Sequence, residues 1–353
     1  MPIKDDARSL FTLGASPVRW PVALQAAVAM GIPAVGFAIA GRADLGLLAS
    51  SGAFTALYLT NRSRRTRARL LPLIAAGLIA SSVLGVATSG SLVLSLASVA
   101  LVAVASATLG LGFRLGPPGA LFFVLVVGVS GHLAASTGLG GAEIDGVLVI
   151  ALLALGCLIA YLVVLAPLLL PSARRRDASK HQATVAPARV RFTLDSASRI
   201  ILVRLAVGSI AAAVLSAPLG IDRAYWVVMT VVAILQNGHR IRLTGLRGVQ
   251  RVLGTLVGVG VFALIQLADP GGVWVALLLV ALQFIVEIVV IRNYGLALVF
   301  ITPLALTIAA QAHAAPAQSL IVDRVSDTLI GAGIALVVLL WAALLRRVPR
   351  ERL

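Results

Sequence analysis

Arg247, Arg251 and Thr255 follow one another at intervals of four residues, which places their side chains one above another on a single face of a helix. Guanidinium groups bind carboxylates through paired hydrogen bonds, and they raise the local concentration of anions. The spacing therefore favours anion binding, with the Thr255 hydroxyl continuing the polar face. Arginines that hold a membrane protein against lipid phosphates would show the same spacing, so the sequence leaves both interpretations open.

Motifs of catalysis and metal binding are missing from the sequence. It contains no HExxH, no P-loop, no GxSxG and no paired carboxylates within an apolar stretch. The single cysteine, Cys157, lies in an apolar run with no metal-ligand spacing around it. We therefore expect no enzymatic activity, no metal and no other cofactor, and the chain by itself lacks the P-loop of an ATP-driven pump.

The composition is typical of a protein that spans a lipid bilayer. Of the 353 residues, 60% are hydrophobic and 12% are charged, whereas soluble domains carry roughly 25% charged residues. A soluble protein this apolar would lack the polar groups to cover its surface. The lipid bilayer is therefore the first expected partner.

Apolar stretches of about membrane-spanning length recur along the chain and predict an all-α polytopic membrane protein. We expect about twelve transmembrane helices, arranged as two parallel repeats of six. The predicted domains are a first membrane half (1–170), a basic cytoplasmic linker (171–199) and a second membrane half (200–353). The predicted spans are 20–40, 45–60, 70–88, 91–113, 119–137, 145–170, 200–219, 224–236, 248–267, 272–291, 295–313 and 323–345.

The distribution of basic residues predicts the orientation. With these spans, 25 of the 29 Lys and Arg residues fall on the side of the linker and both termini, and three fall on the other side. The positive-inside rule makes the basic side cytoplasmic. The net charge of +16 then reflects orientation, and we expect no nucleic-acid partner. The Ala-, Val- and Arg-rich composition suggests a bacterium, hence a bacterial inner membrane, and the first span is read as an uncleaved helix.

The second and eighth spans are unusually short and occupy matching positions in the two halves. Ala224–Leu235 would cover only about 18 Å at 1.5 Å per residue, against roughly 30 Å of hydrocarbon. Short or broken helices in matching positions are the best sequence pointer to the binding site of a transporter. A short helix covered by its neighbours is the alternative. Gly254 and Gly258 form a GxxxG pattern that favours close helix packing.

Ionisable residues within spans are functional suspects because charge is costly in the membrane. Asp327, near the outer end of the twelfth span, is the first candidate for proton coupling. Glu287 and His132 rank below it. None of the three lies clearly at the middle of the bilayer.

Four segments of the second half are similar to a known family. They are Tyr225-Trp226-Val-Val-Met-Thr230, Arg251-Val-Leu-Gly254-Thr255-Leu-Val-Gly258, Asn293-Tyr294-Gly295 running on to Phe300-Ile-Thr302-Pro303, and Arg324-Val-Ser-Asp327-Thr328-Leu-Ile-Gly331. In this order they resemble the fusaric acid resistance family, also called the aromatic acid exporter family. Plant aluminium-activated malate channels are its distant relatives. The resemblance covers roughly residues 200–345, and the first half matches only in outline.

The resemblance implies passage of organic anions, often aromatic carboxylates. It adds a substrate-contact role for Tyr225 and Trp226, which would otherwise be read as interfacial aromatics, and for Thr230 and Gln236 of the same segment. Two departures are evident: this chain lacks the large cytoplasmic domain of many members, and Asn237 follows Gln236 where a proline is common.

We therefore expect a secondary transporter that exports organic, aromatic acid anions at the expense of the proton gradient. The predicted substrate-binding residues are Tyr225, Trp226, Thr230, Gln236, Arg247, Arg251, Thr255 and Asp327. A passive organic-anion channel is the first alternative, and a membrane scaffold or lipid-modifying enzyme is the second. A homo-oligomer is left open.

The charge distribution predicts that both termini are cytoplasmic. Alkaline phosphatase, which is active only outside the cell membrane, should show no activity when fused after Leu353. The same reporter inserted after Ala142, in a predicted outer loop, should be active and serves as the control. Strong activity of the Leu353 fusion would contradict the predicted topology.

Overall fold

The computed structural model describes residues 14, 19–175, 177, 192–218, 223–236, 238, 240–313 and 316–347, and these residues form helices and connecting loops without strands. The predicted termini, most of the linker and Asn237 lie outside the described residues. The helices of the first half are α2 (Trp20–Ile39), α3 (Ala43–Ser50), η1 (Ser51–Leu57), α4 (Arg64–Ala87), α5 (Leu92–Gly112), α6 (Leu121–Ala134), η2 (Thr137–Leu139), α7 (Gly146–Leu165) and η3 (Ala166–Leu169).

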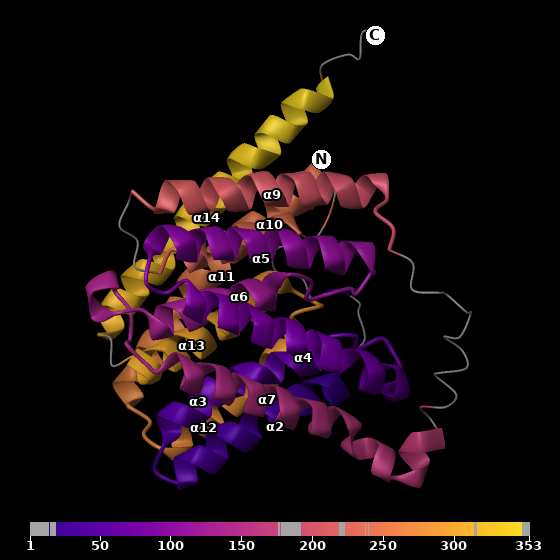
Figure 1. Ribbon diagram of the computed structural model, residues 1–353, viewed down its shortest axis with the longest axis vertical. Coiled ribbons are helices and arrows are strands. Elements are labelled where there is room, and N and C mark those ends of the chain that lie inside the picture. Colours follow the sequence, from indigo (N-terminus) through magenta and orange to yellow (C-terminus); the bar gives the residue numbers. More distant parts are fainter. Residues whose placement is uncertain are drawn as a thin grey trace.

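The described residues of the second half form six helices. They are α9 (Ser196–Ser216), α10 (Tyr225–Leu235), α11 (Ile241–Ala268), α12 (Val273–Val289), α13 (Tyr294–His313) and α14 (Ala317–Arg347). Figure 1 shows most helices stacked side by side, while α14 crosses the others obliquely and projects beyond them at its C-terminal end.

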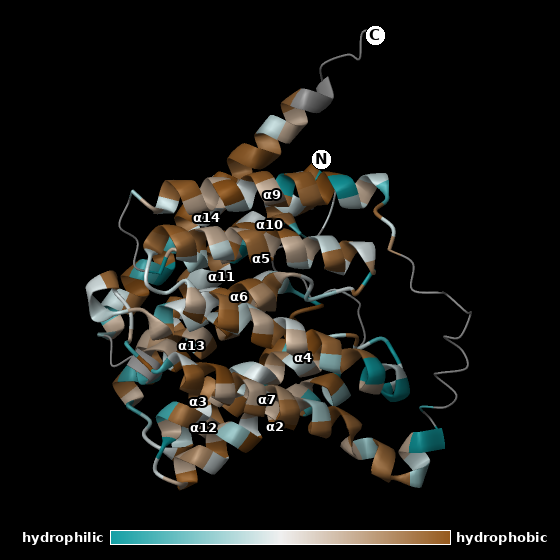
Figure 2. Cartoon of the chain, viewed as in Figure 1, coloured by the Kyte–Doolittle hydropathy of each residue, from teal (hydrophilic) through white to brown (hydrophobic). Residues whose placement is uncertain are grey.

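Eight of these helices are long and apolar enough to cross a membrane. Four further apolar segments are shorter: Ala43–Leu57, Leu121–Ala134, Tyr225–Leu235 and Val273–Val289. Large apolar side chains such as Val147, Leu267 and Trp274 are 75%, 83% and 72% exposed. Figure 2 shows hydrophobic ribbon over most of the helices and hydrophilic ribbon mainly near their ends. Such a surface is stable only against lipid, so the chain is a multi-pass membrane protein.

The two halves of the chain interleave rather than form two separate bundles. Helix α5 of the first half packs on α9 of the second, and α12 of the second packs on α2 of the first. These two pairs lie at opposite ends of the stack in Figure 1. One apolar core accordingly joins α5, α6, α9, α10 and α14, and the other joins mainly α2, α3, η1, α4, α7 and α12.

The same packing pairs recur in both halves. Helix α4 packs on α6 and α7, as α11 packs on α13 and α14. Likewise η1 packs on α7, as α10 packs on α14. Each half thus supplies one long helix, α4 or α11, that packs on the last two α-helices of the same half.

Glycines set the distance between these helices. A Cβ on Gly254 would lie 2.3 Å from the Gly295 carbonyl oxygen, and one on Gly258 would lie 2.7 Å from the Thr302 Cβ. The predicted GxxxG pattern therefore packs α11 directly on α13. In the first half, a Cβ on Gly156 would lie 1.9 Å from the Ala49 carbonyl oxygen.

Helices α4 and α11 begin earlier than the sequence predicts, at Arg64 and Ile241 rather than at 70 and 248. Ser63 caps α4, since its hydroxyl accepts a hydrogen bond from the Thr66 amide at 3.3 Å. The Asp177 carboxylate accepts a further one from the Arg64 amide at 2.6 Å, which stabilises a helix N-terminus. Most of each predicted basic loop is consequently helical.

Replacing Gly254 by Ala should destabilise the protein by about 1–3 kcal/mol, because the added methyl group meets the backbone of α13. Gly260→Ala on the same helix is the matched control, since a Cβ there has no neighbour within 4 Å. Thermal unfolding in detergent measures both. A midpoint for Gly254→Ala equal to that of Gly260→Ala would contradict the close packing of α11 on α13.

Candidate functional site: an arginine-lined cavity between the halves

A cavity of about 920 Å³ lies between the two halves of the chain. Its walls come from α3, η1, α6 and α7 of the first half and from α10 to α13 of the second. The lining includes residues of the loops at the basic end of the helices. Among the described residues, it includes none from the loops at the opposite end. The polar, aromatic and charged lining residues are Arg19, Ser51, Phe54, Thr60, Asn61, Arg62, Arg114, Phe122, Ser130, Tyr225, Trp226, Gln236, Arg247, Arg251, Gln283, Glu287 and Tyr294.

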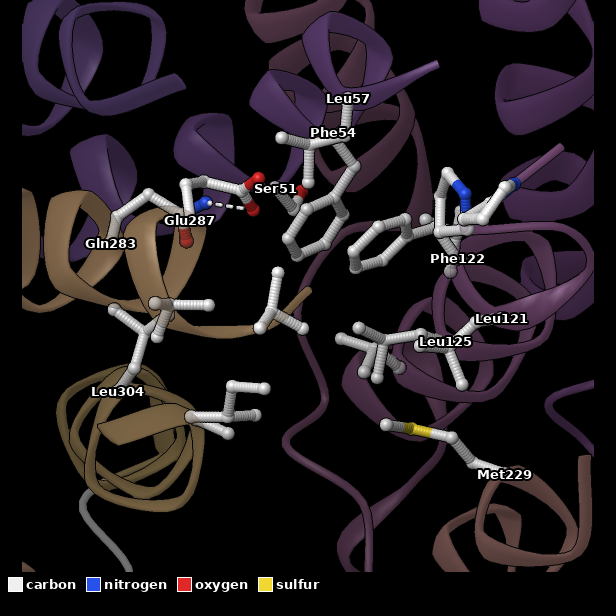
Figure 3. A pocket seen from close by; sticks show the side chains of 18 of the residues that line it. Ser51, Phe54, Leu57, Leu121, Phe122, Leu125, Met229, Gln283, Glu287 and Leu304 are labelled. Atoms are coloured by element: carbon white, nitrogen blue, oxygen red, sulfur yellow. Dashed lines mark hydrogen bonds between the residues drawn. The ribbon is translucent and has the colours of Figure 1, made fainter. Parts of the chain in front are cut away.

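The two short helical segments both line this cavity. All eleven residues of α10 are buried, and its length of about 16 Å leaves it enclosed by neighbouring helices. The other segment changes from α-helix to 3₁₀-helix at Ser51. Figure 3 shows Ser51, Phe54 and Leu57 of this segment, with Phe122 of α6 and Met229 of α10 facing the same space. The rings of Phe54 and Phe122 stack with centroids 4.1 Å apart.

The cavity carries an excess of positive charge. Five arginines line it, Arg19, Arg62, Arg114, Arg247 and Arg251, and Glu287 is the single carboxylate among the described lining residues. The Gln283 amide donates a hydrogen bond to the Glu287 carboxylate at 3.3 Å, drawn in Figure 3. Apolar walls weaken screening, so this charge favours the entry of an anion.

Arg251 is held in place by two neighbouring helices. Its side chain is buried, 2% exposed. Its Nε donates to the Thr230 hydroxyl of α10 at 3.2 Å, and its Nη1 donates to the Tyr294 hydroxyl of α13 at 2.8 Å. Its Nη2 has no hydrogen-bond partner. The guanidinium is therefore fixed on two nitrogens and keeps a third for a ligand.

Arg247 lies one helical turn nearer the basic end and is less buried than Arg251. Its guanidinium carbon is 4.1 Å from the centroid of the Tyr294 ring. A cation over an aromatic face is weakly stabilised. Tyr294 thus supports both arginines, one through its ring and one through its hydroxyl.

Each residue of the Asn293-Tyr294-Gly295 segment has a structural task. The Asn293 side chain accepts a hydrogen bond from the Leu296 amide at 2.9 Å and so begins α13. Tyr294 binds the arginines, and Gly295 lets α11 approach at Gly254. The turn therefore places Arg251 and Tyr294 within hydrogen-bonding distance.

Helix α14 completes the wall behind α10. A Cβ on Gly331 would lie 2.7 Å from the Thr230 Cβ, so the two helices cross closely there. The Arg324 guanidinium carbon is 4.0 Å from the centroid of the Trp226 ring. Asp327 is completely buried, and its carboxylate oxygens have no hydrogen-bond partner. The four segments singled out in the sequence thus meet around Thr230, Trp226 and Arg251.

Gln236 connects this site to the first half of the chain. Its side-chain oxygen accepts a hydrogen bond from the Ala120 amide at 3.1 Å. The hydroxyl of Tyr58 donates to the carbonyl of the neighbouring Gly119 at 2.9 Å. Gln236 therefore lies where the basic-end loops of the two halves meet.

The opposite end of α10 is tied to both halves by charged side chains. Arg223 forms an ion pair with Asp323 of α14 at 2.8 Å. Its Nε also lies 3.4 Å from Nε2 of His132 of α6, and the His132 ring is 5.9 Å from that of Tyr225. This cluster lies at the end of α10 away from the basic loops, and its member Tyr225 also lines the cavity.

The structure separates the predicted site residues into two groups. Five of them, Tyr225, Trp226, Gln236, Arg247 and Arg251, line the cavity. Thr230, Thr255 and Asp327 are buried beside it without lining it. Their role as substrate contacts stays a prediction.

Sequence reasoning assigned no substrate role to four residues that the structure places in or beside the site: Tyr294, Gln283, Glu287 and Arg324. Tyr294 and Arg324 stand in the segments that carry the family resemblance, and that signal was sufficient to find them. Gln283 and Glu287 are one helical turn apart on α12, with no motif around them. Among the described residues, no three His, Cys, Asp or Glu side chains converge as a metal site would require.

Comparison with known proteins confirms the resemblance. Residues 207–338 match the family described as "Fusaric acid resistance protein-like". The chain is 33% identical over 169 residues to the uncharacterized membrane protein YvaC of Bacillus subtilis strain 168. The aligned region is 46% of this chain and 26% of that relative, so the chain spans about a quarter of the relative's length. No solved structure matches the chain.

Replacing Arg251 by Gln should weaken the binding of an aromatic carboxylate by at least about tenfold, because a hydrogen bond to a charged group contributes about 1.5–3 kcal/mol. Insertion should be normal, since the other basic residues still set the topology. Arg247→Gln should have a smaller effect that declines with salt, because Arg247 is more exposed. Titration of the purified variants with benzoate measures both. If the Arg251→Gln protein inserts normally and binds benzoate with the affinity of the parent, the role of Arg251 is structural only.

Proposed function

We propose that this protein is a secondary transporter that exports organic, aromatic acid anions, driven by the proton gradient across a bacterial inner membrane. The premise is the match of residues 207–338 to the fusaric acid resistance-like family. In this proposal the basic end of the helices, with both termini, faces the cytoplasm, because positive residues are retained there.

The observation that carries the proposal is the cavity itself. It combines five arginines with one carboxylate among its described lining residues, and its walls include aromatic side chains. An aromatic carboxylate matches this combination, since its ring packs on apolar walls and its charge binds to a guanidinium group. The cavity volume of about 920 Å³ exceeds what a single small acid needs, so the site accommodates substituted rings as well.

The recurrent packing pairs support an organisation as two six-helix repeats of the same orientation, with about twelve spans. The eight long helices and the four shorter apolar segments together supply that number. In a repeat of this kind, a substrate site lies where the halves meet. The cavity between the halves is consistent with that place.

The ends of the cavity favour a transporter over a passive channel. The cavity extends to the loops of the basic end and stops short of those at the other end, among the described residues. The Arg223–Asp323 ion pair lies at that other end of α10. A site open to one side at a time is the requirement of alternating access, whereas a channel needs a continuous path. A membrane scaffold would not require a charged internal cavity.

Coupling to protons requires a carboxyl group that the transported anion can influence. Glu287 lines the cavity, and Asp327 does not. We therefore assign the coupling role first to Glu287, although the sequence favours Asp327. Both are buried carboxyl groups within helices that cross the apolar layer.

Uptake into proteoliposomes tests the proposal. Flux of benzoate and 4-hydroxybenzoate should exceed that of malate, and an imposed proton gradient should accelerate it at least about threefold, as expected of coupled transport. Equal fluxes with and without the gradient would indicate a passive channel. Absence of flux for the whole panel would contradict transport of organic acids.

The matched variants are Glu287→Gln and Glu143→Gln, the second on an exposed loop residue. Glu287→Gln should abolish the acceleration by the proton gradient while downhill flux continues, because the glutamine amide cannot bind and release a proton as a carboxyl group does. Glu143→Gln should behave as the parent. Full acceleration in the Glu287→Gln protein would assign coupling elsewhere.

A further inference from the structure

Arg324 is a buried cation without a protein counter-ion in contact. Its side chain is 1% exposed, and Nε, Nη1 and Nη2 all lack a hydrogen-bond partner. Its guanidinium carbon lies 4.0 Å from the centroid of the Trp226 ring. A cation–π contact offsets part of the loss of hydration but leaves the N–H groups unsatisfied.

The surrounding carboxylates do not neutralise Arg324 directly. Asp323 is engaged by Arg223 at 2.8 Å. Asp327 lies one helical turn from Arg324 on α14, yet neither of its oxygens accepts a hydrogen bond. Unpaired charges buried in this way are rare and mark functional sites in membrane proteins. The geometry leaves the Arg324 guanidinium available to a ligand.

Arg324 and Arg251 occupy successive positions along the same face of α10. Arg324 lies over Trp226, and Arg251 donates to Thr230, four residues further along the helix. Four residues correspond to about 6 Å along a helix axis. The points at which the two guanidinium groups contact α10 are therefore about one helical turn apart.

Trp226 contacts Arg324 and also lines the cavity. Arg251 lines the cavity as well, whereas Arg324 does not. Arg223, at the N-terminal end of α10, lies next in the direction away from the basic end. Arginines thus follow α10 from Arg251 through Arg324 to Arg223.

The local charge defines the ligand class. Arg251 and Arg324 place two buried guanidinium groups along α10, so an anion is the ligand that balances their charge. Each guanidinium has at least one free N–H group for it. Guanidinium groups with free N–H donors suit a carboxylate, which accepts two hydrogen bonds in one plane.

We propose that Arg324 is a second carboxylate-binding residue and that the transported carboxylate passes from Arg251 to Arg324. The inference rests on the proposed function and extends it beyond the cavity. Arg251 then serves capture from the basic end, and Arg324 serves the step toward the opposite end. Removing Arg324 should therefore impair transport while binding is retained, whereas removing Arg251 should impair both.

The experiment compares benzoate binding to purified protein with benzoate flux in proteoliposomes. Arg324→Gln should retain benzoate affinity within about threefold of the parent, while its flux falls at least about tenfold, because only the capture residue is intact. Arg251→Gln should lose affinity as well as flux. Arg204→Gln is the matched control: Arg204 is also buried, 2% exposed, but it donates to the Gly238 carbonyl at 2.6 Å and does not line the cavity.

Arg324→Lys provides a second measurement, because loss of a buried charge can disturb folding. Lysine keeps the charge and loses the planar pair of donors, so flux should fall by at least about threefold with normal insertion. Parental flux in both Arg324 variants, with the parent protein active, would overturn this inference and leave the proposed function standing. A parent protein that neither binds nor transports benzoate or 4-hydroxybenzoate would overturn the proposed function and the inference together.

Discussion

The hydrogen bonds of Arg251 join the elements on which the site depends. A guanidinium that is 2% exposed in an apolar helix is stable only when other helices supply its acceptors. Thr230 and Tyr294 supply two. They bring α10, α11 and α13 to one point, and Gly254 and Gly331 allow the helix crossings that this geometry requires. The same contacts that fix Arg251 form one wall of the cavity.

The short helix α10 is the element around which the charges are arranged. All its residues are buried, because α5, α6, α9, α11 and α14 pack around it. Enclosure places Trp226 and Thr230 where Arg324 and Arg251 reach them from two different helices. Enclosure of the whole helix therefore holds these polar groups in the interior, where electrostatic interactions are strong.

The interleaving of the halves explains how one cavity belongs to both. Because α5 packs on α9 and α12 packs on α2, neither half closes on itself. Each half needs a helix of the other to complete its core. Glu287 of α12 consequently faces Ser51 and Phe54 of the first half across the cavity (Figure 3). A relative movement of the two cores would change the cavity at both ends.

The sequence by itself determined the membrane-embedded, all-helical class and most helix positions. Apolar length and the clustering of basic residues are properties of local sequence, and they translate directly into helices of known length in lipid. The shortness of 224–236 was equally visible, and α10 spans Tyr225–Leu235. The starts of α4 and α11 were misplaced because arginines were counted as loop residues, although they extend helices readily.

Only the tertiary structure decided which polar residues meet. The spacing of Arg247, Arg251 and Thr255 placed them on one face of a helix. It could not identify Tyr294 of α13 as the partner of the two arginines. Nor could it place Glu287 in the cavity and Asp327 outside it. Glu287 lies in a strongly apolar stretch and Asp327 lies beside Asp323 and Arg324, yet neither local sequence indicates which carboxylate faces the cavity. The difference arises from the rotation of each helix about its axis, which is set by packing between segments distant in the chain and leaves no local pattern.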